Sequence, residues 1–496
     1  MESVFSRGRL FRNNTAICSS DTSFTYHALS EDSDSLAHYL LSTPDFIESG
    51  IGFMVVPGFE YVVAQWAIWK AGGIAVPLSL NQPKSNLEYI IEDAGVSIII
   101  CSSKFEAELI EVISKYNIRL IVLGESILKF KNDRKLPEIR ESQKAMILYT
   151  SGTTSKPKGV VTTHAQINAQ ISSLIEAWGW SSADRILCVL PLHHIHGIIN
   201  VVCCALWTGA SIEFLYPFDE SEIFKVFANG SVNIFMAVPT IYYKLVSFYE
   251  SLPSDSQQRI SEKFKDFRLM VSGSAALPIS VFQKWEIISG HFLLERYGMT
   301  EIGMAISNPY SGDRRPGYIG QPLPNVQVKL VDDAGVSILN NNPGEILIKG
   351  PTVFLEYWNK PEATREAFTA DGWFKTGDIA VLENGYYKIL GRSSIDIIKS
   401  GGYKISALEI EEAIRTMHKV RDCAVVGIAD EEWGEVIGAV IVLQDNCLME
   451  YDELKDWLLQ KISHYKLPRA ILFENDLPRN AMGKVVKSEI KKMFKV

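Results

Sequence analysis

Three absences in the 496-residue sequence narrow the class of protein before any motif is considered. Its seven cysteines include no Cys-x-x-Cys pair, which argues against a zinc ribbon and a disulfide-stapled scaffold and indicates thiols in a reducing compartment. No apolar run approaches the roughly 18 to 20 residues that a membrane-spanning helix needs, so we expect a soluble protein without a membrane span. Internal repeats and low-complexity segments are also missing, which excludes a solenoid.

An excess of positive charge is missing as well. Lysine and arginine total 49 against 58 aspartate and glutamate, giving a formal net charge of −9. Global charge therefore does not favour a nucleic-acid partner, although a local basic pocket for a phosphorylated ligand is compatible with it. Hydrophobic residues make up 47% of the chain, as in ordinary folded proteins. The length predicts about three domains, or one large and one small.

The first fourteen residues, MESVFSRGRLFRNN, contain arginine and serine and little acid. Such a segment resembles a mitochondrial presequence, but it leads almost at once into the strand-like TAICSSDTSFTY. The last residues, KKMFKV, carry no address signal. We therefore expect a cytoplasmic protein, with the mitochondrial matrix as the alternative.

Short β-rich runs alternate with helical stretches from Asp21 to about Ser400. Ile51–Pro57 predicts a buried strand, Tyr61–Lys70 an amphipathic helix and Ile74–Pro77 another strand. This alternation is typical of an α/β protein with parallel sheets covered by helices.

After Gly317 the sequence pattern predicts shorter strands. A hairpin turn is expected at Glu383-Asn384-Gly385. A compact unit of mixed β and α character follows Gly391-Arg392. The predicted fold class is thus a large N-terminal domain of α/β layers with a β-rich subdomain (residues 1–391), a hinge region (392–396) and a small mobile α+β C-terminal domain (397–496).

The densest polar motif is YTSGTTSKPKGV, which begins at Tyr149. It follows the strand-like AMIL and precedes a helix expected near His164, and its spacing is not that of a Walker loop. Backbone amides and hydroxyls here can converge on phosphate oxygens, with Lys158 as a mobile cation. A polar surface loop is the alternative. The predicted phosphate contacts are Thr150, Ser151, Gly152, Thr153, Thr154 and Lys158.

The histidine-rich segment His193-His194-Ile195-His196 raises the question of a metal site. Three histidines within four residues cannot complete a tetrahedral site without distant ligands, so we do not expect zinc here. His194 is expected to flank a substrate site. For His196, a buried structural role is the alternative.

Eight motifs in order resemble those of the acyl-adenylate-forming enzymes, which include acyl-CoA synthetases, adenylation domains of peptide synthetases and luciferases. Besides the phosphate loop, they are LPLHHIHG, SGSAA, YGMTE, TGD, GR, SGGY and PRNAMGK. One departure is Ser155, where the family usually has glycine. The resemblance covers nearly the whole chain and implies an ATP-dependent acid:CoA ligase that forms an acyl-AMP and then an acyl-CoA.

The resemblance also implies roles for individual residues, beginning with the nucleotide. An adenine and ribose site would contain Gly273, Ser274, Ala275, Tyr297, Gly298, Met299, Asp378 and Arg392. Tyr297 offers a face for the purine, and Asp378 can accept hydrogen bonds from the ribose hydroxyls. Each of the two charged residues, taken alone, would more often be a surface salt-bridge residue.

Chemistry would fall to Lys484, Thr300, Glu301 and His194. Glu301 is the candidate Mg²⁺ ligand, because Mg²⁺ in nucleotide sites uses one or two carboxylates with phosphate and water. Lys484 would enter the site for adenylation and stabilise developing charge on the α-phosphate. After a rotation of the C-terminal domain, Ser400, Gly401, Gly402 and Tyr403 would line the coenzyme A channel.

Arg296 precedes the Tyr297 turn and indicates which kind of acid is the substrate. A buried guanidinium without a partner is costly, so we expect an anion to meet it, with structural pairing to Glu295 as the alternative. The motifs resemble the malonyl-CoA synthetase branch most closely, which implies that Arg296, His196 and Ser272 hold the second carboxylate of malonate or methylmalonate.

Three other functions remain open from the sequence. They are a medium- or long-chain fatty acyl-CoA synthetase, a stand-alone adenylation enzyme that loads a carrier protein, and a noncatalytic nucleotide-binding protein. No carrier site follows Lys484, and the retention of Lys484, Glu301 and Asp378 argues against the binding protein.

Overall fold

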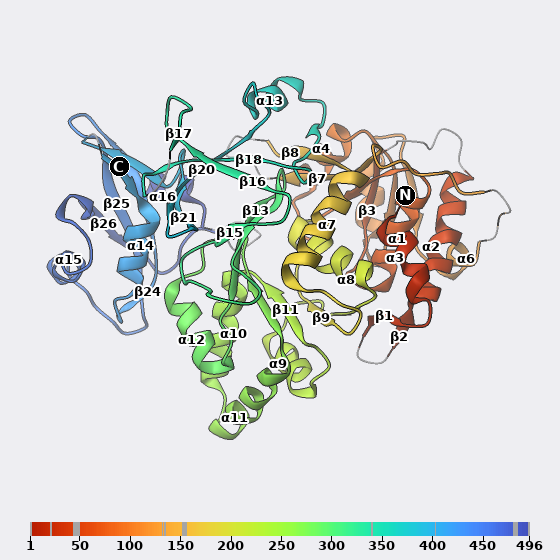
Figure 1. Ribbon diagram of the computed structural model, residues 1–496, viewed down its shortest axis with the longest axis horizontal. Coiled ribbons are helices and arrows are strands. Elements are labelled where there is room, and N and C mark those ends of the chain that lie inside the picture. The colour runs from red at the N-terminus through yellow and green to blue at the C-terminus, as the bar shows by residue number, and fades with distance from the viewer. Residues whose placement is uncertain are drawn as a thin grey trace.

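The computed structural model describes residues 2–19, 22–42, 50–130, 132, 135–150, 156–338, 341–401, 403–479 and 485–494, with Lys404 described by its backbone alone. Two large sheets, a β-rich sheet and a separate C-terminal sheet make up the fold. In Figure 1 the red N-terminal part and the blue C-terminal unit lie on opposite sides of the molecule.

The first large sheet has seven strands in the order β19-β8-β7-β4-β3-β5-β6. Its interior pairs are parallel, and β7, β8 and β19 pair antiparallel at one edge. The strands are β3 (Gly50–Met54), β4 (Ile74–Pro77), β5 (Val96–Cys101), β6 (Arg119–Val122), β7 (Lys144–Thr150), β8 (Lys158–Thr163) and β19 (Glu356–Tyr357).

The second large sheet has nine strands in the order β15-β14-β13-β12-β11-β9-β10-β1-β2. It too is parallel inside and antiparallel at both edges, so the predicted parallel layers are confirmed. The strands are β1 (Thr15–Cys18), β2 (Ser23–Thr25), β9 (Arg185–Cys188), β10 (Ser211–Phe214), β11 (Ile234–Ala237), β12 (Leu269–Ser272), β13 (Leu294–Met299), β14 (Gly303–Ser307) and β15 (Gln321–Pro322).

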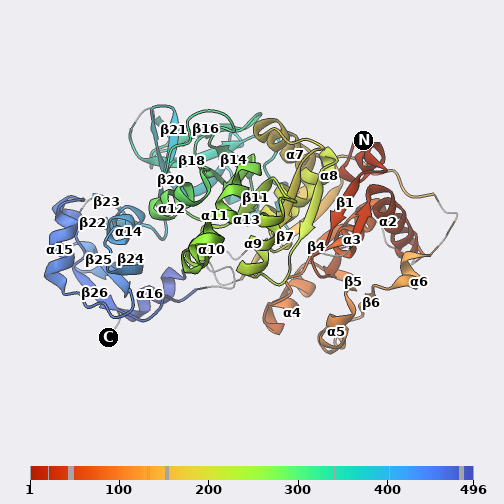
Figure 2. The same ribbon diagram turned by 90° about the horizontal axis from the view of Figure 1, so that it is seen from below.

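Helices cover and separate these sheets, as Figures 1 and 2 show from two sides. One of them, η3 (His196–Cys203), is a π-helix. The others are α1 (Val4–Arg7), α2 (Tyr26–Leu41), α3 (Phe59–Lys70), α4 (Lys84–Asp93), α5 (Glu106–Ile113), α6 (Glu125–Leu128), α7 (His164–Trp178), α8 (Cys204–Thr208), α9 (Glu220–Asn229), α10 (Pro239–Ser251), α11 (Ser254–Lys263), α12 (Ile279–Ser289) and α13 (Pro361–Glu366), with short 3₁₀ turns at Gly8–Phe11, Ser103–Phe105 and Phe264–Asp266.

The prediction that residues 61–70 form a helix is confirmed, but the expected amphipathic character is wrong. Every residue of α3 from Tyr61 to Lys70 is buried. The helix is buried on all sides and carries mostly apolar side chains, which is the pattern of a core helix rather than a surface one. At its end the buried Lys70 ammonium is satisfied by Asp34, 2.7 Å away, so its charge does not require solvent.

The β-rich subdomain is an antiparallel sheet in the order β17-β16-β18-β20-β21. The predicted hairpin turn is confirmed: Asn384 and Gly385 have φ values of 50° and 80° between β20 and β21. Two positive φ angles in a two-residue loop match the twist of a hairpin. The strands are β16 (Gln327–Val331), β17 (Ser337–Ile338), β18 (Gly344–Lys349), β20 (Phe374–Glu383) and β21 (Tyr386–Arg392).

The C-terminal unit has its own sheet and hydrophobic core. It contacts the larger unit where Glu412 accepts a hydrogen bond from the Ile279 amide at the start of α12 (3.2 Å). Its elements are β22 (Ile397–Ser400), β23 (Tyr403–Ser406), α14 (Ala407–Arg415), β24 (Val420–Asp430), β25 (Gly434–Leu443), α15 (Tyr451–Leu459), a 3₁₀ turn (His464–Lys466), β26 (Ala470–Phe473) and α16 (Lys487–Met493).

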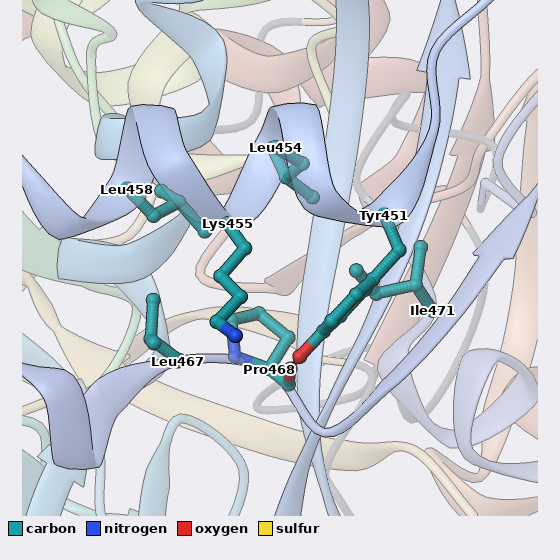
Figure 3. Close-up of a pocket in the computed structure, with 7 residues that line it drawn as sticks. All are labelled: Tyr451, Leu454, Lys455, Leu458, Leu467, Pro468 and Ile471. Carbon is teal, nitrogen blue, oxygen red and sulfur yellow. Dashed lines mark hydrogen bonds between the residues drawn. The ribbon is translucent and has the colours of Figure 1, made fainter.

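A small groove on this unit lies between α15 and the segment that leads into β26 (Figure 3). Tyr451, Leu454 and Leu458 line one side, and Leu467, Pro468 and Ile471 line the other. None of the predicted site residues that the structure describes lines it. The groove therefore does not mark the candidate active site.

The N-terminal segment packs against the fold. The Arg7 Nε donates to the Trp207 carbonyl (3.0 Å), and the Asn168 side chain donates to the Glu2 carbonyl (2.8 Å). Within the described ranges, no helix combines the length and hydropathy needed to cross a bilayer.

Candidate active site

Strand β13 lies at the centre of the candidate site. It pairs with β12 on one side and β14 on the other. Because side chains alternate along a strand, Arg296 and Tyr297 project to opposite faces of the sheet. At the turn toward β14, a Cβ on Gly298 would lie 2.2 Å from the Gly303 carbonyl oxygen, so this hairpin requires glycine.

On one face, three predicted nucleotide residues from β13, β20 and β21 meet. The Tyr297 hydroxyl donates to Asp378 Oδ2 (2.6 Å), and Arg392 Nε donates to Asp378 Oδ1 (2.9 Å). Tyr297 is buried, and this burial together with the nearby Asp378 carboxylate holds its pKa well above the ordinary value. The hydroxyl therefore remains a donor that orients Asp378.

Glu301 lies beyond the β13 turn and is buried. The Tyr357 hydroxyl donates to its Oε1 (3.0 Å), and the Lys158 ammonium lies 4.8 Å from the centre of the Tyr357 ring. Burial raises the pKa of Glu301, while the Tyr357 hydrogen bond opposes that shift. Tyr357 is a contact that sequence reasoning missed, since nothing in the motif around it marks it.

The predicted phosphate loop, residues 151–155, lies outside the described residues. Its two ends belong to the antiparallel hairpin of β7 and β8, where Thr150 pairs with Lys158. The motif lies between a strand and a helix as predicted, and strand β8, which the sequence pattern did not indicate, also precedes α7. The predicted start of that helix at His164 is confirmed.

Two residues of α4 hold both ends of this loop, and no sequence signal marked them. Asp93 Oδ2 accepts from the Tyr149 hydroxyl (2.7 Å), and the Tyr89 hydroxyl donates to the Pro157 carbonyl (2.9 Å). The Lys360 ammonium lies 2.9 Å from Asp93 Oδ1. The ends of the loop are thus fixed by a local charged network.

On the other face of β13, Arg296, His196 and Ser274 form a group that we call the arginine cluster. Arg296 Nη2 donates to Ser274 Oγ (3.4 Å), and the same oxygen lies 3.3 Å from His196 Nδ1. Ser274 has φ = 71°, a left-handed conformation uncommon for serine. Ser274, expected at the nucleotide, therefore contacts the residues expected at the acid.

The arginine cluster is buried and short of hydrogen-bond partners. Arg296 is 3% exposed and His196 4%, and Ser272 is fully covered. Among the described residues, Arg296 Nε, His196 Nε2 and Ser272 Oγ have no hydrogen-bond partner. Buried polar atoms are nearly always paired, so the two in the arginine cluster indicate a ligand site. Ser272, also predicted at the acid, is the register partner of Glu295 and therefore faces the side of the sheet opposite Arg296.

Burial sets the charge of this cluster. It lowers the pKa of Arg296 to about 9, which leaves the guanidinium cationic at neutral pH. Burial, reinforced by the Arg296 charge, holds the pKa of His196 well below its ordinary value, so this imidazole is neutral. The cluster thus presents one positive charge and neutral hydrogen-bonding groups.

Glu295 does not compensate this charge, so the alternative of structural pairing fails. Its Oε1 accepts from the Gly317 amide (3.1 Å) instead. Within the described ranges, no carboxylate forms an ion pair with Arg296. Burial, with a smaller contribution from the Glu412 charge, raises the pKa of Glu295 to about 8.

Glu295→Gln is therefore expected to stabilise the protein in mildly alkaline solution. The folded state binds a proton that the unfolded state releases between about pH 4.5 and pH 8, so the contribution of Glu295 to stability falls as pH rises through that window. The melting temperature should drop less between pH 6 and pH 9 in the variant than in the parent. An identical drop in both would contradict the buried, protonated state.

The remaining predicted residues occupy varied positions. Thr300, Met299 and His194 are half-buried, Ala275 is exposed, and the His194 ring lies 4.1 Å from that of His193. On the C-terminal unit, Tyr403 is exposed and stacks on Tyr465 (4.6 Å), and Ser400 and Gly401 lie at the β22–β23 turn. Gly402 and Lys484 lie outside the described residues.

The chain was compared with known families and curated proteins. Residues 5–358 match the family described as AMP-binding enzyme, and residues 409–484 match the AMP-binding enzyme C-terminal domain. The mitochondrial malonate–CoA ligase ACSF3 of Xenopus laevis is 40% identical, over 98% of this chain and 91% of the relative. The malonate–CoA ligase of Arabidopsis thaliana is 41% identical, over 89% of this chain and 77% of the relative.

A solved structure supports the same assignment. ATP-bound MatB from Rhodopseudomonas palustris superposes with a TM-score of 0.91 at 30% identity, covering 100% of this chain and 99% of the other. Its fold confirms the predicted large N-terminal and small C-terminal domains. By the extent of the sequence match and by its fold, the chain belongs to the AMP-binding enzyme family.

Proposed function

We propose that this protein is an AMP-forming malonate–CoA ligase. In the first step, a malonate carboxylate attacks the α-phosphate of ATP, giving malonyl-AMP and pyrophosphate. In the second, the coenzyme A thiolate attacks the mixed anhydride, giving malonyl-CoA and AMP. Methylmalonate is a second candidate acid, because the recognition rests on the second carboxylate that both acids share.

The observation that supports malonate as the substrate is the buried Arg296 guanidinium. It lacks a carboxylate partner among the described residues. A planar guanidinium binds a carboxylate through two parallel hydrogen bonds, and in a buried site that interaction is strong. His196 Nε2 has no hydrogen-bond partner among the described residues and is available to complete the carboxylate's hydrogen bonds. A fatty acid would leave all of these polar groups buried and unsatisfied, which is costly. The relatives named as malonate–CoA ligases agree with this choice.

For the nucleotide, we assign Asp378 and Arg392 to the ribose and the Tyr297 turn, with Gly273 and Ala275, to the adenine. The oriented Asp378 carboxylate supports the ribose assignment. Thr150, Lys158 and the loop between them would hold the phosphates. The Glu301 carboxylate suits an Mg²⁺ ion that arrives with ATP, since such an ion needs few protein ligands, and it would offset phosphate charge there.

We assign the residues of the C-terminal unit to two stages of the reaction. Lys484 would act in adenylation, and the turn of Ser400, Gly401, Gly402 and Tyr403 would line the coenzyme A channel. A hinge at residues 392–396, between domains 1–391 and 397–496, would allow the C-terminal unit to rotate. The rotation would replace Lys484 by this turn at the active site between the two steps. The separate sheet and core of the C-terminal unit support such a rotation.

The deciding experiment measures pyrophosphate release with Mg-ATP and a panel of acids, with and without coenzyme A. Malonate should give pyrophosphate and malonyl-CoA, and octanoate neither. A preference for octanoate would favour a fatty acyl-CoA synthetase. Adenylate without thioester would indicate carrier loading, and no pyrophosphate with any acid would indicate a binding protein.

Gly273→Ala is expected to raise the KM for malonate by about tenfold. A Cβ at this position would lie 2.5 Å from the Arg296 guanidinium carbon, so the arginine must move. The measurement is steady-state kinetics with malonate and with ATP varied separately. Unchanged malonate kinetics would show that the position of Arg296 does not control the acid.

For the compartment, we propose the cytoplasm, with the mitochondrial matrix as the alternative. Seven free thiols fit either reducing space. The Xenopus relative carries "mitochondrial" in its name, which favours the alternative. Microscopy of the chain with a fluorescent protein at its C-terminus distinguishes the two.

A further inference from the structure

Six charged side chains of alternating sign form a continuous chain in the C-terminal unit, which we call the charge relay. In order they are Arg479, Asp422, Arg415, Glu411, Lys487 and Asp396. Arg479 pairs with Asp422, which lies 3.6 Å from Arg415 Nε. Arg415 Nη2 is 3.2 Å from Glu411 Oε2. Lys487 Nζ completes the relay, 2.7 Å from Glu411 and 2.6 Å from Asp396.

The centre of the relay is buried more deeply than its outer end. The side chains of Glu411 and Lys487 are 4% and 10% exposed, against 33% for Arg479. A buried charge is tolerated only when opposite charges surround it, so each member holds its neighbours in place. Glu411 is fixed further by the Val425 amide, which donates to its Oε1 (2.9 Å).

Both ends of the segment that contains Lys484 join this relay. Arg479 precedes residues 480–484, and Lys487 follows them at the start of α16. The ends also meet through an antiparallel bridge between Arg479 and Val485 and through the Val486 amide, which donates to the Pro478 carbonyl (2.9 Å). The two ends are thus closed by backbone bonds and anchored by charge.

The other end of the relay reaches the proposed hinge. Asp396 Oδ2 accepts from the Arg392 amide (3.0 Å), and the Arg392 side chain pairs with Asp378. A Cβ on Gly391 would lie 2.4 Å from the Asp396 Cβ, so the hinge is packed tightly against this carboxylate. Asp396 therefore connects the Lys487 ammonium to the backbone next to the proposed ribose site.

We propose that Lys487, through Asp396 and Glu411, is a positioning residue that sets the placement of Lys484 relative to the hinge during adenylation. The proposal rests on the proposed function, in which Lys484 acts in the first step alone. Lys487 would act through Lys484 and not on a substrate, because its ammonium is held by the two carboxylates. Only two residues separate it from Lys484 in the sequence, so the position of the Lys487 backbone limits where the Lys484 backbone can lie.

The test compares Lys487→Met with Lys487→Arg in two half-reactions. Single-turnover pyrophosphate release with malonate and ATP reports adenylation, and conversion of supplied malonyl-AMP by coenzyme A reports thioester formation. In Lys487→Met, adenylation should slow by at least about tenfold while thioester formation is nearly unchanged, since a misplaced catalytic group is costly. Lys487→Arg, which keeps the charge, should recover most of the adenylation rate.

Lys492→Met is the matched control, because Lys492 lies on the same helix and pairs with Glu489 at the surface. It should leave both half-reactions unchanged. Equal slowing of both half-reactions in Lys487→Met, or no slowing of either, would overturn the proposal. If circular dichroism shows that Lys487→Met is unfolded, Arg479→Met, at the more exposed end of the relay, replaces it in the test. The same selective loss of adenylation is expected, and an equal loss of both half-reactions would overturn the proposal.

Measurements on the parent enzyme distinguish a failure of the proposed function from a failure of the positioning role of Lys487. If the parent releases no pyrophosphate with malonate, the proposed function fails and the half-reactions are repeated with whichever acid it activates. If the parent is active and Lys487→Met is not selective, the positioning role alone fails.

Discussion

Arg296→Met is expected to lower kcat/KM for malonate by roughly 10²- to 10⁴-fold while leaving the KM for ATP nearly unchanged. The substitution keeps an unbranched apolar stem and removes the buried charge that would pair with the second carboxylate. The measurement is steady-state malonyl-CoA formation with each substrate varied in turn.

Stability provides an independent reading of the same variant. Arg296 has no carboxylate partner among the described residues, so its removal relieves the cost of a buried charge. The melting temperature without substrate should therefore stay level or rise. A loss of malonate activity without a loss of stability is the signature of a substrate-binding group.

Two controls sharpen this experiment. Arg296→Lys keeps the charge but not the fork of parallel donors, so an intermediate loss is expected. Arg315→Met alters a half-buried arginine that pairs with Asp313, and malonate kinetics should not change. If Arg296→Met turned over malonate as fast as the parent, the diacid assignment would be wrong, although membership of the family would stand.

Lys484→Ala is expected to slow adenylate formation by at least about 10²-fold and to spare the reaction of supplied malonyl-AMP with coenzyme A. A positive charge near the α-phosphate stabilises the transition state of the first step, and the second step transfers an acyl group from an adenylate already formed. Pyrophosphate release and thioester formation are measured separately.

The outcome of Lys484→Ala bears on the domain rotation as well as on the residue. Equal loss in both half-reactions would contradict a lysine that acts in one conformation only. Lys484→Arg is the matched variant: it keeps the charge with a different shape, so partial adenylation should remain. The charge relay predicts that Lys487→Met reproduces the selectivity of Lys484→Ala with a smaller effect.

Much of the architecture could be predicted because it depends on local pattern. Alternating apolar runs and turn residues indicated the parallel sheets and the hairpin at Asn384-Gly385, since side-chain periodicity and turn geometry are set by neighbouring residues. The order of eight motifs indicated the family. The character of α3 was mispredicted, because whether a helix is covered on one side or on all sides depends on elements far away in the chain.

The sequence by itself determined the fold class, the family and the candidate reaction, because these follow from local periodicity and from motifs read in order. Only the tertiary structure decided that Arg296 is buried without an ion pair to Glu295, that Ser274 faces His196 and Arg296, and that Asp93 and Tyr89 hold the ends of the predicted phosphate loop. It also assembled the charge relay from β24, α14, α16 and the proposed hinge. These contacts join residues distant in sequence, and the burial that gives them their energy exists only once the chain has folded.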